Sequence, residues 1–331
     1  MRHIKEQGLT ALYFYIFYRK VIDIKDHITA YIFATIHAII IGFSFMFSKN
    51  ALKYSQPLDA LAFRFSACLI VLMVAVVLKW INVDNIIKNL RHLVGIALFY
   101  PIMFFGFQTF GLAYASSSEG GILNATAPVF TMVLSALFLG ERTTLAQKCS
   151  ILLSVSGVIY IFIMKGAGFD FTKVLGILLL LLSNLSLSGY NIMARTKMKQ
   201  FSVTEVSFIM IVFGFLAFNT AAVTNHILKG TLDQFFLPLG SSEFIISILY
   251  LGILSSLVTS MLTNYVLSKI EAARMSVFGN LGTVVSIFAG SFFLKEPIYL
   301  YHIVGSLMII TGVIGTNYIR LKTKMPDSQN R

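Results

Sequence analysis

The stretch FLGERTT at residues 138–144 places a glutamate and an arginine between two apolar runs, each long enough to cross a bilayer. The stretch FLKEPIY at residues 293–299 repeats this arrangement 155 positions later. Aligned with itself at that offset, the sequence matches residues 129–159 to residues 284–314 without a gap, and nine of the 31 pairs are identical. A long internal repeat of this kind indicates that the chain is built from two copies of one structural unit.

Two of the identical pairs carry most of the weight, because apolar bias alone does not readily produce them. Glu141 aligns with Glu296, and Gly157 aligns with Gly312. A second alignment, at an offset of 147, pairs GFSFM at residues 42–46 with GYNIM in the second half of the chain. The repeat therefore extends over most of the sequence.

The composition is that of an integral membrane protein. The chain has 331 residues, of which 57% are hydrophobic and 12% charged, and its mean hydropathy is +0.81. Soluble domains carry roughly 25% charged residues, so a water-soluble globule is excluded. Apolar runs of about 20 residues, the length that crosses the hydrocarbon as a helix, occur at 28–48, 58–79, 93–114, 118–139, 145–164, 174–194, 205–226, 243–264, 272–294 and 300–320.

Ten spans in two copies make a unit of five helices, and an odd number forces the second copy into the membrane upside down. We therefore expect an all-α protein with ten transmembrane helices in two inverted five-helix repeats, at 28–164 and 174–320. Many secondary transporters have this architecture, with the substrate site near the midplane between the halves. Residues 1–27 and 321–331 are expected to form cytoplasmic segments. The first of these contains ALYFYIFY, which either lies along the membrane surface or belongs to a frayed tail.

The net charge of +12 reflects membrane topology rather than nucleic-acid binding. If the N-terminus is cytoplasmic, 19 of the 26 Lys and Arg fall in inner segments, six in outer segments and one within a span. This asymmetry follows the positive-inside rule and predicts a multi-pass protein of the cell membrane with both termini in the cytoplasm.

Several of these stretches resemble a known family. GFSFMFSKNAL (42–52), QPLDALAFR (56–64) and NATAPVFTMVLSALFLGERTTLAQKCSILLSVSGVIYI (124–161), with the echo of the last at 279–316, are similar to the EamA family of the drug/metabolite transporter superfamily. The resemblance covers nearly the whole chain. It implies two five-helix halves around a central cavity and movement of small organic solutes such as amino acids or other metabolites, without implying which solute.

Acidic residues are confined to loops, tails and helix ends. At the start of a span a carboxylate meets exposed N–H groups and the positive end of the helix dipole, so capping is one interpretation for several of them. The alternative is a cation or proton site at a water-filled mouth, for which Glu119 is the best candidate.

Two basic residues are predicted away from both ends of a span. His37 shares a helix face with Ser44 and is either a structural, hydrogen-bonded histidine or a proton-coupling group. Arg64 matches an arginine common in the family that the chain resembles. It either binds a substrate carboxylate, snorkels to the interface or pairs with Asp59.

Neutral polar residues recur on several predicted spans and either join helices or line a shared polar and aromatic cavity. In the sixth span, Asn184, Ser188 and Asn191 fall on one helical face. With His37 and Arg64, the candidates for the cavity are Ser44, Gln108, Asn124, Asn184, Ser188, Asn191, Thr263, Asn264 and Asn280. Pro101 and Pro128 are expected to kink the third and fourth spans and to free carbonyls toward that cavity.

The sequence favours a secondary-active transporter of small organic metabolites, working by alternating access, with amino acids or amphipathic compounds as preferred substrates. Its partners would be the substrate, the lipid bilayer and coupled protons, and the ten-helix unit could work as a monomer. The six histidines are scattered, and no catalytic, metal or cofactor motif is recognisable. A membrane-embedded enzyme, a channel, or a sensory or structural membrane protein are the alternatives.

Overall fold

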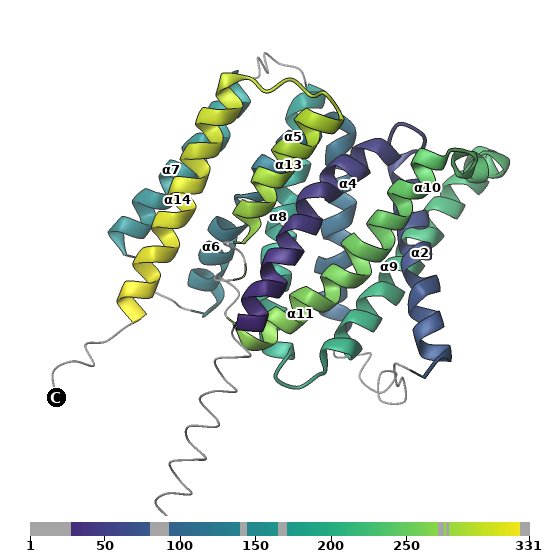
Figure 1. Cartoon of the computed structure of the whole chain (residues 1–331), viewed down its shortest axis with the longest axis horizontal. Coiled ribbons are helices and arrows are strands. Elements are labelled where there is room, and N and C mark those ends of the chain that lie inside the picture. The colour runs from purple at the N-terminus through teal and green to yellow at the C-terminus, as the bar shows by residue number, and fades with distance from the viewer. Residues whose placement is uncertain are drawn as a thin grey trace, which may run out of the picture.

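The computed structural model describes residues 28–79, 93–139, 144–164, 171–270, 275 and 278–324. Every regular element in these residues is helical, and the helices lie side by side as one bundle (Figure 1). Helix α7 (Leu145–Met164) packs against α14 (Leu300–Lys324) at one end of the bundle. Helix α2 (Pro57–Val77) packs against α9 (Val203–Lys229) at the other end. The all-α class predicted from the sequence is confirmed for the described residues.

Seven helices of the described chain are long and apolar enough to cross a membrane. Three shorter apolar helices accompany them, at Lys148–Ile161, Gly279–Phe293 and Leu300–Gly312. Four of the seven are Ile28–Ala51, α2, α8 (Phe171–Lys197) and α9. The other three are each divided into shorter elements. Leu93–Tyr114 contains η1 (Leu98–Met103) and α4 (Phe104–Tyr114), Ser117–Phe138 contains α5 (Ser117–Asn124) and most of α6 (Ala127–Leu139), and Ser242–Lys269 contains α10 (Ser242–Leu249), η3 (Tyr250–Val258) and α11 (Thr259–Lys269). The 3₁₀ segment η2 (Leu232–Gly240) and the helices α7, α13 (Gly279–Phe293) and α14 complete the described fold.

The distribution of side chains differs from that in a soluble protein. Large apolar side chains face outward along the bundle, as Val77 at 78% and Phe138 at 77% exposure illustrate. Many hydroxyl and amide side chains are buried between the helices, together with other apolar side chains. Exposed apolar surface on this scale is unstable in water and suits contact with lipid tails. The protein is therefore a membrane protein with its polar groups inside.

Capping explains several of the acidic residues near helix starts. Glu119 and Glu205 each form a reciprocal capping box with the serine three positions earlier, Ser116 and Ser202. Asp59 lies in the first turn of α2, and its Oδ1 is 3.0 Å from Nε2 of His226 on α9. The carboxylate of Asp59 thus also joins two helices.

One expectation about the repeated charges needs correction. Glu296 and Pro297 fit the start of the tenth helix by sequence, yet α14 begins at Leu300. The carboxylate of Glu296 instead accepts hydrogen bonds from the backbone N–H groups of Ser117 and Ser118, at 2.8 and 2.9 Å. Glu296 therefore caps α5, a helix from the other half of the sequence, because four N–H groups at a helix start lack partners within the helix.

Candidate functional site

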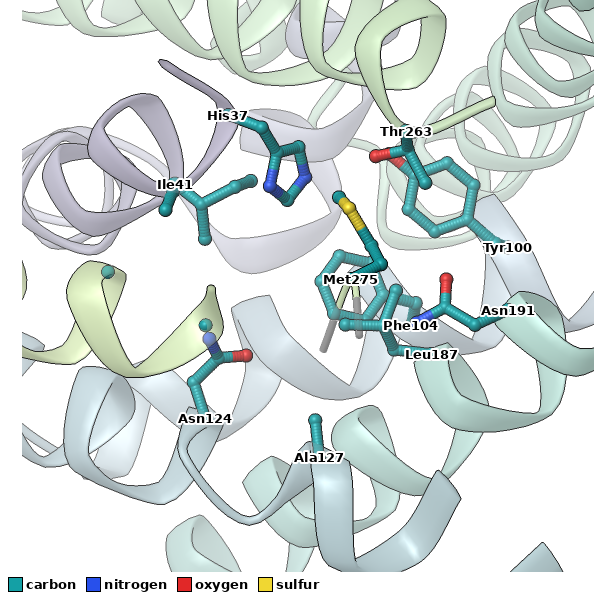
Figure 2. Close-up of a pocket in the computed structure, with 13 residues that line it drawn as sticks. His37, Ile41, Tyr100, Phe104, Asn124, Ala127, Leu187, Asn191, Thr263 and Met275 are labelled. Atoms are coloured by element: carbon teal, nitrogen blue, oxygen red, sulfur yellow. The ribbon is translucent and has the colours of Figure 1, made fainter. Parts of the chain in front are cut away.

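A cavity lies inside the bundle and is lined from several helices that are distant in sequence (Figure 2). Its volume is about 50 Å³. This space holds a few water molecules but is far smaller than the roughly 300–1,000 Å³ of a typical small-molecule site. The described lining residues are His37, Ala38, Ile41, Tyr100, Phe104, Asn124, Ala127, Leu187, Asn191, Thr263, Met275, Gly279 and Gly282.

A break in the fourth predicted span creates one wall of this cavity. Helix α5 ends at Asn124, and α6 begins at Ala127. Pro128 causes the break, because it has no N–H to donate to the carbonyl four residues earlier, and its ring clashes with that carbonyl, which belongs to Asn124. The sequence therefore places the amide of Asn124 at an interruption of the helix, where it faces the cavity.

The third predicted span is interrupted in a similar way. Within η1, Tyr100 leaves helical geometry with φ −143° and ψ 118°, directly before Pro101. The residue before a proline is pushed toward extended backbone by the proline ring. The interruption brings Tyr100 to the cavity, with its ring 5.3 Å from that of Phe104, so the predicted kink at Pro101 is confirmed.

Two of the predicted polar residues on α8 satisfy carbonyls at the break in the fourth span. Nδ2 of Asn184 donates to the carbonyl of Leu123 at 2.8 Å, and Oγ of Ser188 donates to the carbonyl of Ala127 at 2.9 Å. Each carbonyl also accepts from a threonine hydroxyl of its own span, Leu123 from Thr126 at 2.7 Å and Ala127 from Thr131 at 2.9 Å. Asn184 and Ser188 are thus structural partners of the broken helix and do not line the cavity.

Asn191, one helical turn further along α8, does line the cavity. Its Oδ1 is buried and has no hydrogen-bond partner among the described residues, and Oδ1 of Asn124 is in the same state. Both side chains belong to residues at most 5% exposed. Buried amide oxygens normally have donors, so two such oxygens in one cavity are an unusual concentration of unused acceptors.

His37 occupies the wall opposite Asn124, and its imidazole points into the cavity (Figure 2). Thr263 of α11 lies on the same cavity. Four of the predicted cavity residues, His37, Asn124, Asn191 and Thr263, are therefore brought together by the fold, although they span 227 positions of sequence.

Arg64 lies outside the cavity lining and is held by other groups. Its Nε donates to Oγ of Ser256 at 2.7 Å, and its Nη2 donates to Oγ and the carbonyl of Ser255 at 3.0 and 3.2 Å. The guanidinium carbon stacks 3.9 Å from the ring centroid of Phe105. At 1% exposure, Arg64 does not snorkel to the interface.

The remaining candidates are buried or half-buried in helix contacts and do not line the cavity. Asn264 accepts a hydrogen bond from the hydroxyl of Tyr190 at 2.5 Å and donates to Oγ of Ser207 at 2.9 Å. Ser44 donates to the carbonyl of Ile41 in its own helix. Gln108 is buried in α4, and Asn280 of α13 has a buried Oδ1 without a partner among the described residues.

Glu119 lies apart from the cavity at the start of α5. Its Oε1 is 3.9 Å from Nε2 of His302, and both side chains are 6% exposed. Nδ1 of His302 accepts from the backbone N–H of Tyr299 at 3.3 Å, so the neutral ring carries its proton on Nε2, facing Glu119. Within the residues that the structure describes, no group of three or more His, Cys, Asp or Glu is arranged to hold a metal ion.

Sequence reasoning missed the apolar part of the lining. Phe104, Leu187, Ile41 and Met275 contact the cavity, yet nothing in a chain with 30 Phe and 13 Met distinguishes them beforehand. Tyr100 carried a usable signal, because it directly precedes Pro101.

Comparison with known proteins agrees with this architecture. The sequence model of the EamA-like transporter family matches residues 28–163 and 174–318. The chain is 44% identical over 298 residues to an uncharacterized transporter of Bacillus subtilis, YcxC, covering 90% of this chain and 96% of that protein. An uncharacterized transporter of Archaeoglobus fulgidus is 26% identical, covering 82% of this chain and 92% of that protein.

A solved crystal structure resembles the fold with a TM-score of 0.62 at 18% identity, covering 88% of this chain and 98% of that one. This likeness concerns the fold alone. The matches to the family model and to the relatives extend across nearly the whole sequence, so the chain belongs to the EamA-like transporter family and is a membrane transporter.

Proposed function

We propose that the chain is a secondary-active transporter of small organic metabolites, with amino acids or amphipathic compounds as substrates, and that it works by alternating access around the cavity at His37 and Asn191. The observation that carries this proposal is the position of the cavity. Residues from both halves of the sequence line it, and it lies at interruptions in two apolar helices. Interrupted helices near the midplane are characteristic of transporter binding sites.

The contact between α7 and α14 supports an inverted repeat of ten helices. A Cβ added to Gly157 would lie 2.8 Å from the carbonyl of Gly305, and one added to Gly312 would lie 2.5 Å from the carbonyl of Ser150. Gly157 corresponds to Gly312, and Ser150 to Gly305, at the 155-residue offset. The two close approaches are therefore equivalents of each other, as contacts across a two-fold axis must be.

The interrupted helices support the same symmetry. The π-helical segments η1 and η3 occur at Leu98–Met103 and Tyr250–Val258, in the third and eighth predicted spans, which are equivalent members of the two proposed halves. The directions of the first and last helices are also compatible with both termini on one side of the membrane. The start of Ile28–Ala51 and the end of α14 lie at the same edge of the bundle (Figure 1). We propose that this edge is cytoplasmic in the cell membrane.

The small volume of the cavity has a mechanistic consequence. A space of about 50 Å³ cannot enclose an organic solute, so the lining helices must separate to admit one. Alternating access would then consist of opening the cavity to one side at a time. His37 is placed to accept a proton within the same space, which makes it the leading candidate for proton coupling, and Glu119 beside His302 is the second.

Counterflow in proteoliposomes tests the proposal. Purified protein is reconstituted with unlabelled solute inside, and uptake of the labelled solute is followed while its outside concentration is varied. A transporter gives transient accumulation that saturates with concentration. Flux that never saturates would indicate a channel, and chemical conversion of the solute would indicate an enzyme, so either result would contradict the proposal.

A further inference from the structure

We propose that Asp59 and His226 form a proton-binding site between α2 and α9, and that release of the proton weakens the contact between these helices. The site is distinct from His37 and Glu119, the two candidates for proton coupling. The bound proton belongs to the folded chain without substrate, so the site stands apart from the proposed transport function. The hydrogen bonds around the imidazole of His226 require this proton.

One ring nitrogen of His226 faces an oxygen that can only accept. Nδ1 lies 2.8 Å from the backbone carbonyl of Thr231 and 2.9 Å from Oγ1 of the same residue. A carbonyl oxygen has no hydrogen to donate, whereas the hydroxyl of Thr231 can donate or accept. The contact with the carbonyl is therefore a hydrogen bond only if Nδ1 carries a proton.

The other ring nitrogen of His226 faces a carboxylate. Nε2 lies 3.0 Å from Oδ1 of Asp59. A neutral imidazole has a single N–H, which His226 uses at Nδ1, so the lone pair of Nε2 would point at the carboxylate. Two acceptors do not attract each other at this distance. One further proton must lie between Nε2 and Oδ1, either on the ring or on the acid.

Burial makes this proton necessary for the contact. Asp59 and His226 are each 4% exposed, and the ring of Phe235 on η2 packs against the imidazole with 5.4 Å between ring centroids. Little water can replace the lost hydrogen bond, and a buried carboxylate without a partner is strongly unfavourable. Loss of the proton therefore weakens the contact between the start of α2 and the end of α9.

The other titratable side chains at this end of α2, α9, η2 and α10, and in the segment before α2, are exposed: Lys53, Tyr54, Lys229, Asp233 and Glu243. Water screens the charges of exposed groups. Among these five, Lys229 acts electrostatically on Asp59. Its positive charge favours the carboxylate over the carboxylic acid, so the proton of the pair belongs on the ring, as an imidazolium beside a carboxylate.

A second buried histidine, His302, has the opposite arrangement. It also faces a carboxylate, with Nε2 3.9 Å from Oε1 of Glu119. Its Nδ1 accepts from the backbone N–H of Tyr299 at 3.3 Å, so the single proton of the neutral ring lies on Nε2 and already points toward the acid. The contact of His302 with Glu119 needs no additional proton, and His302 is therefore the matched control.

The position of the pair decides which solution supplies the proton. Helix α2 follows directly after Ile28–Ala51 in the chain, so Asp59 in its first turn lies at the edge of the bundle away from the start of that helix. In the proposed topology this edge is external. The site then exchanges its proton with the external medium.

The pH dependence of thermal unfolding tests for the proton. The purified full chain in detergent is unfolded at several values between about pH 6 and 8.5. Above about pH 6.5 a histidine of the unfolded chain has lost its proton, whereas the folded pair retains one, so the contribution of the pair to stability falls as the pH rises. For one extra proton, the equilibrium constant of unfolding should rise by up to about tenfold per pH unit.

Two variants remove the need for the proton and keep a hydrogen bond. Asp59→Asn offers an amide N–H to Nε2 of the neutral ring, and His226→Gln offers one to the carboxylate. The melting temperature of each variant should fall less with rising pH than that of the unchanged protein, so the test survives if one of them does not fold. His302→Gln should not reduce this fall.

Nitrogen NMR of the protein, isotopically labelled at its histidine rings, reports the proton on Nδ1 directly. The signals of His226 are those that disappear in His226→Gln, and we expect its Nδ1 to be protonated at neutral pH. An unprotonated Nδ1, an equal pH dependence in the unchanged protein and both pair variants, or a loss of the pH dependence in His302→Gln would overturn the inference. These measurements need neither substrate nor flux, so their failure is distinguishable from a failure of transport in counterflow.

Discussion

Oε2 of Glu296 accepts a hydrogen bond from Oγ of Ser118 at 2.7 Å and another from its backbone N–H at 2.9 Å. The two residues are 178 positions apart, and the contact fastens the segment before α14 to the start of α5. A charge that lies between two apolar runs of the sequence thus joins the two halves of the chain.

Replacing Glu296 should destabilise the protein. Glu296→Gln retains one acceptor oxygen but loses the charge that strengthens the bonds to Ser117 and Ser118, and we expect a loss of about 1–3 kcal/mol in unfolding free energy. Glu296→Ala should cost more. Thermal unfolding of the purified protein in detergent measures both. Glu243→Gln is the control and should have a smaller effect, because the carboxylate of Glu243 is exposed and accepts one hydrogen bond among the described residues, from the hydroxyl of Tyr54. Equal losses at the two positions would contradict the capping role of Glu296.

Adding a methyl group at the contact of α7 and α14 should be unfavourable. The Cβ of Gly157→Ala would lie 2.8 Å from a backbone carbonyl and that of Gly312→Ala 2.5 Å from another, and backbone atoms do not move aside easily. We expect about 1–3 kcal/mol of destabilisation from each substitution. Gly95→Ala is the matched control, because nothing lies within 4 Å of its Cβ, so it should be neutral or stabilising by up to about 1 kcal/mol. A similar melting temperature for all three variants would argue against close packing of these helices.

Replacing Arg64 by methionine should destabilise the protein less than replacing it by lysine. Arg64→Lys keeps a buried cation but cannot reproduce the stacking on Phe105 together with the fork of bonds to Ser255 and Ser256. Arg64→Met removes the charge and its desolvation cost while keeping apolar volume. We expect Arg64→Lys to be the less stable variant, by about 1–3 kcal/mol, in thermal unfolding. A more stable Arg64→Lys would show that the charge itself is required.

His37 should be required for any coupling of transport to protons. His37→Gln keeps a polar side chain in the cavity but cannot take up a proton between pH 5 and 8. We expect flux driven by a pH gradient in vesicles to be lost, while counterflow without a gradient remains. Full pH-driven flux in His37→Gln would exclude this role and leave Glu119 as the candidate to test, with Glu119→Gln.

The inverted topology predicts opposite locations for the two glutamates of the repeat. Single cysteines at positions 142 and 297 of a cysteine-free variant should react with a membrane-impermeant reagent from opposite sides of the membrane. Residue 142 should be cytoplasmic and residue 297 external. Labelling of both from the same side would contradict the inverted repeat and remove its support for alternating access.

The sequence by itself determined the class of the protein and the places where its helices break. Its apolar composition predicts a helical membrane protein, because only helices and closed barrels satisfy the backbone in lipid. Pro101 and Pro128 predict the interruptions at Tyr100 and Asn124, because a proline restricts the residue before it and cannot bond the carbonyl four residues earlier. These are local effects and can be read without tertiary information.

What the sequence predicts for the segments outside the described residues remains a prediction. They include residues 1–27, the segment with Glu141, and the end of the chain beyond residue 324. The same holds for the count of ten crossings, since three of the apolar helices are short within the described bounds.

Only the tertiary structure decided what each polar side chain does. Asn184, Ser188 and Asn191 share one face of α8 and look equivalent by sequence, yet the first two bond carbonyls of the fourth span and the third meets the cavity. Arg64 looked available to a substrate until its contacts with Ser255 and Ser256, more than 190 positions away, were known. A hydrogen bond depends on the distance between two groups in space, and for groups this far apart in sequence that distance is set by how the helices pack.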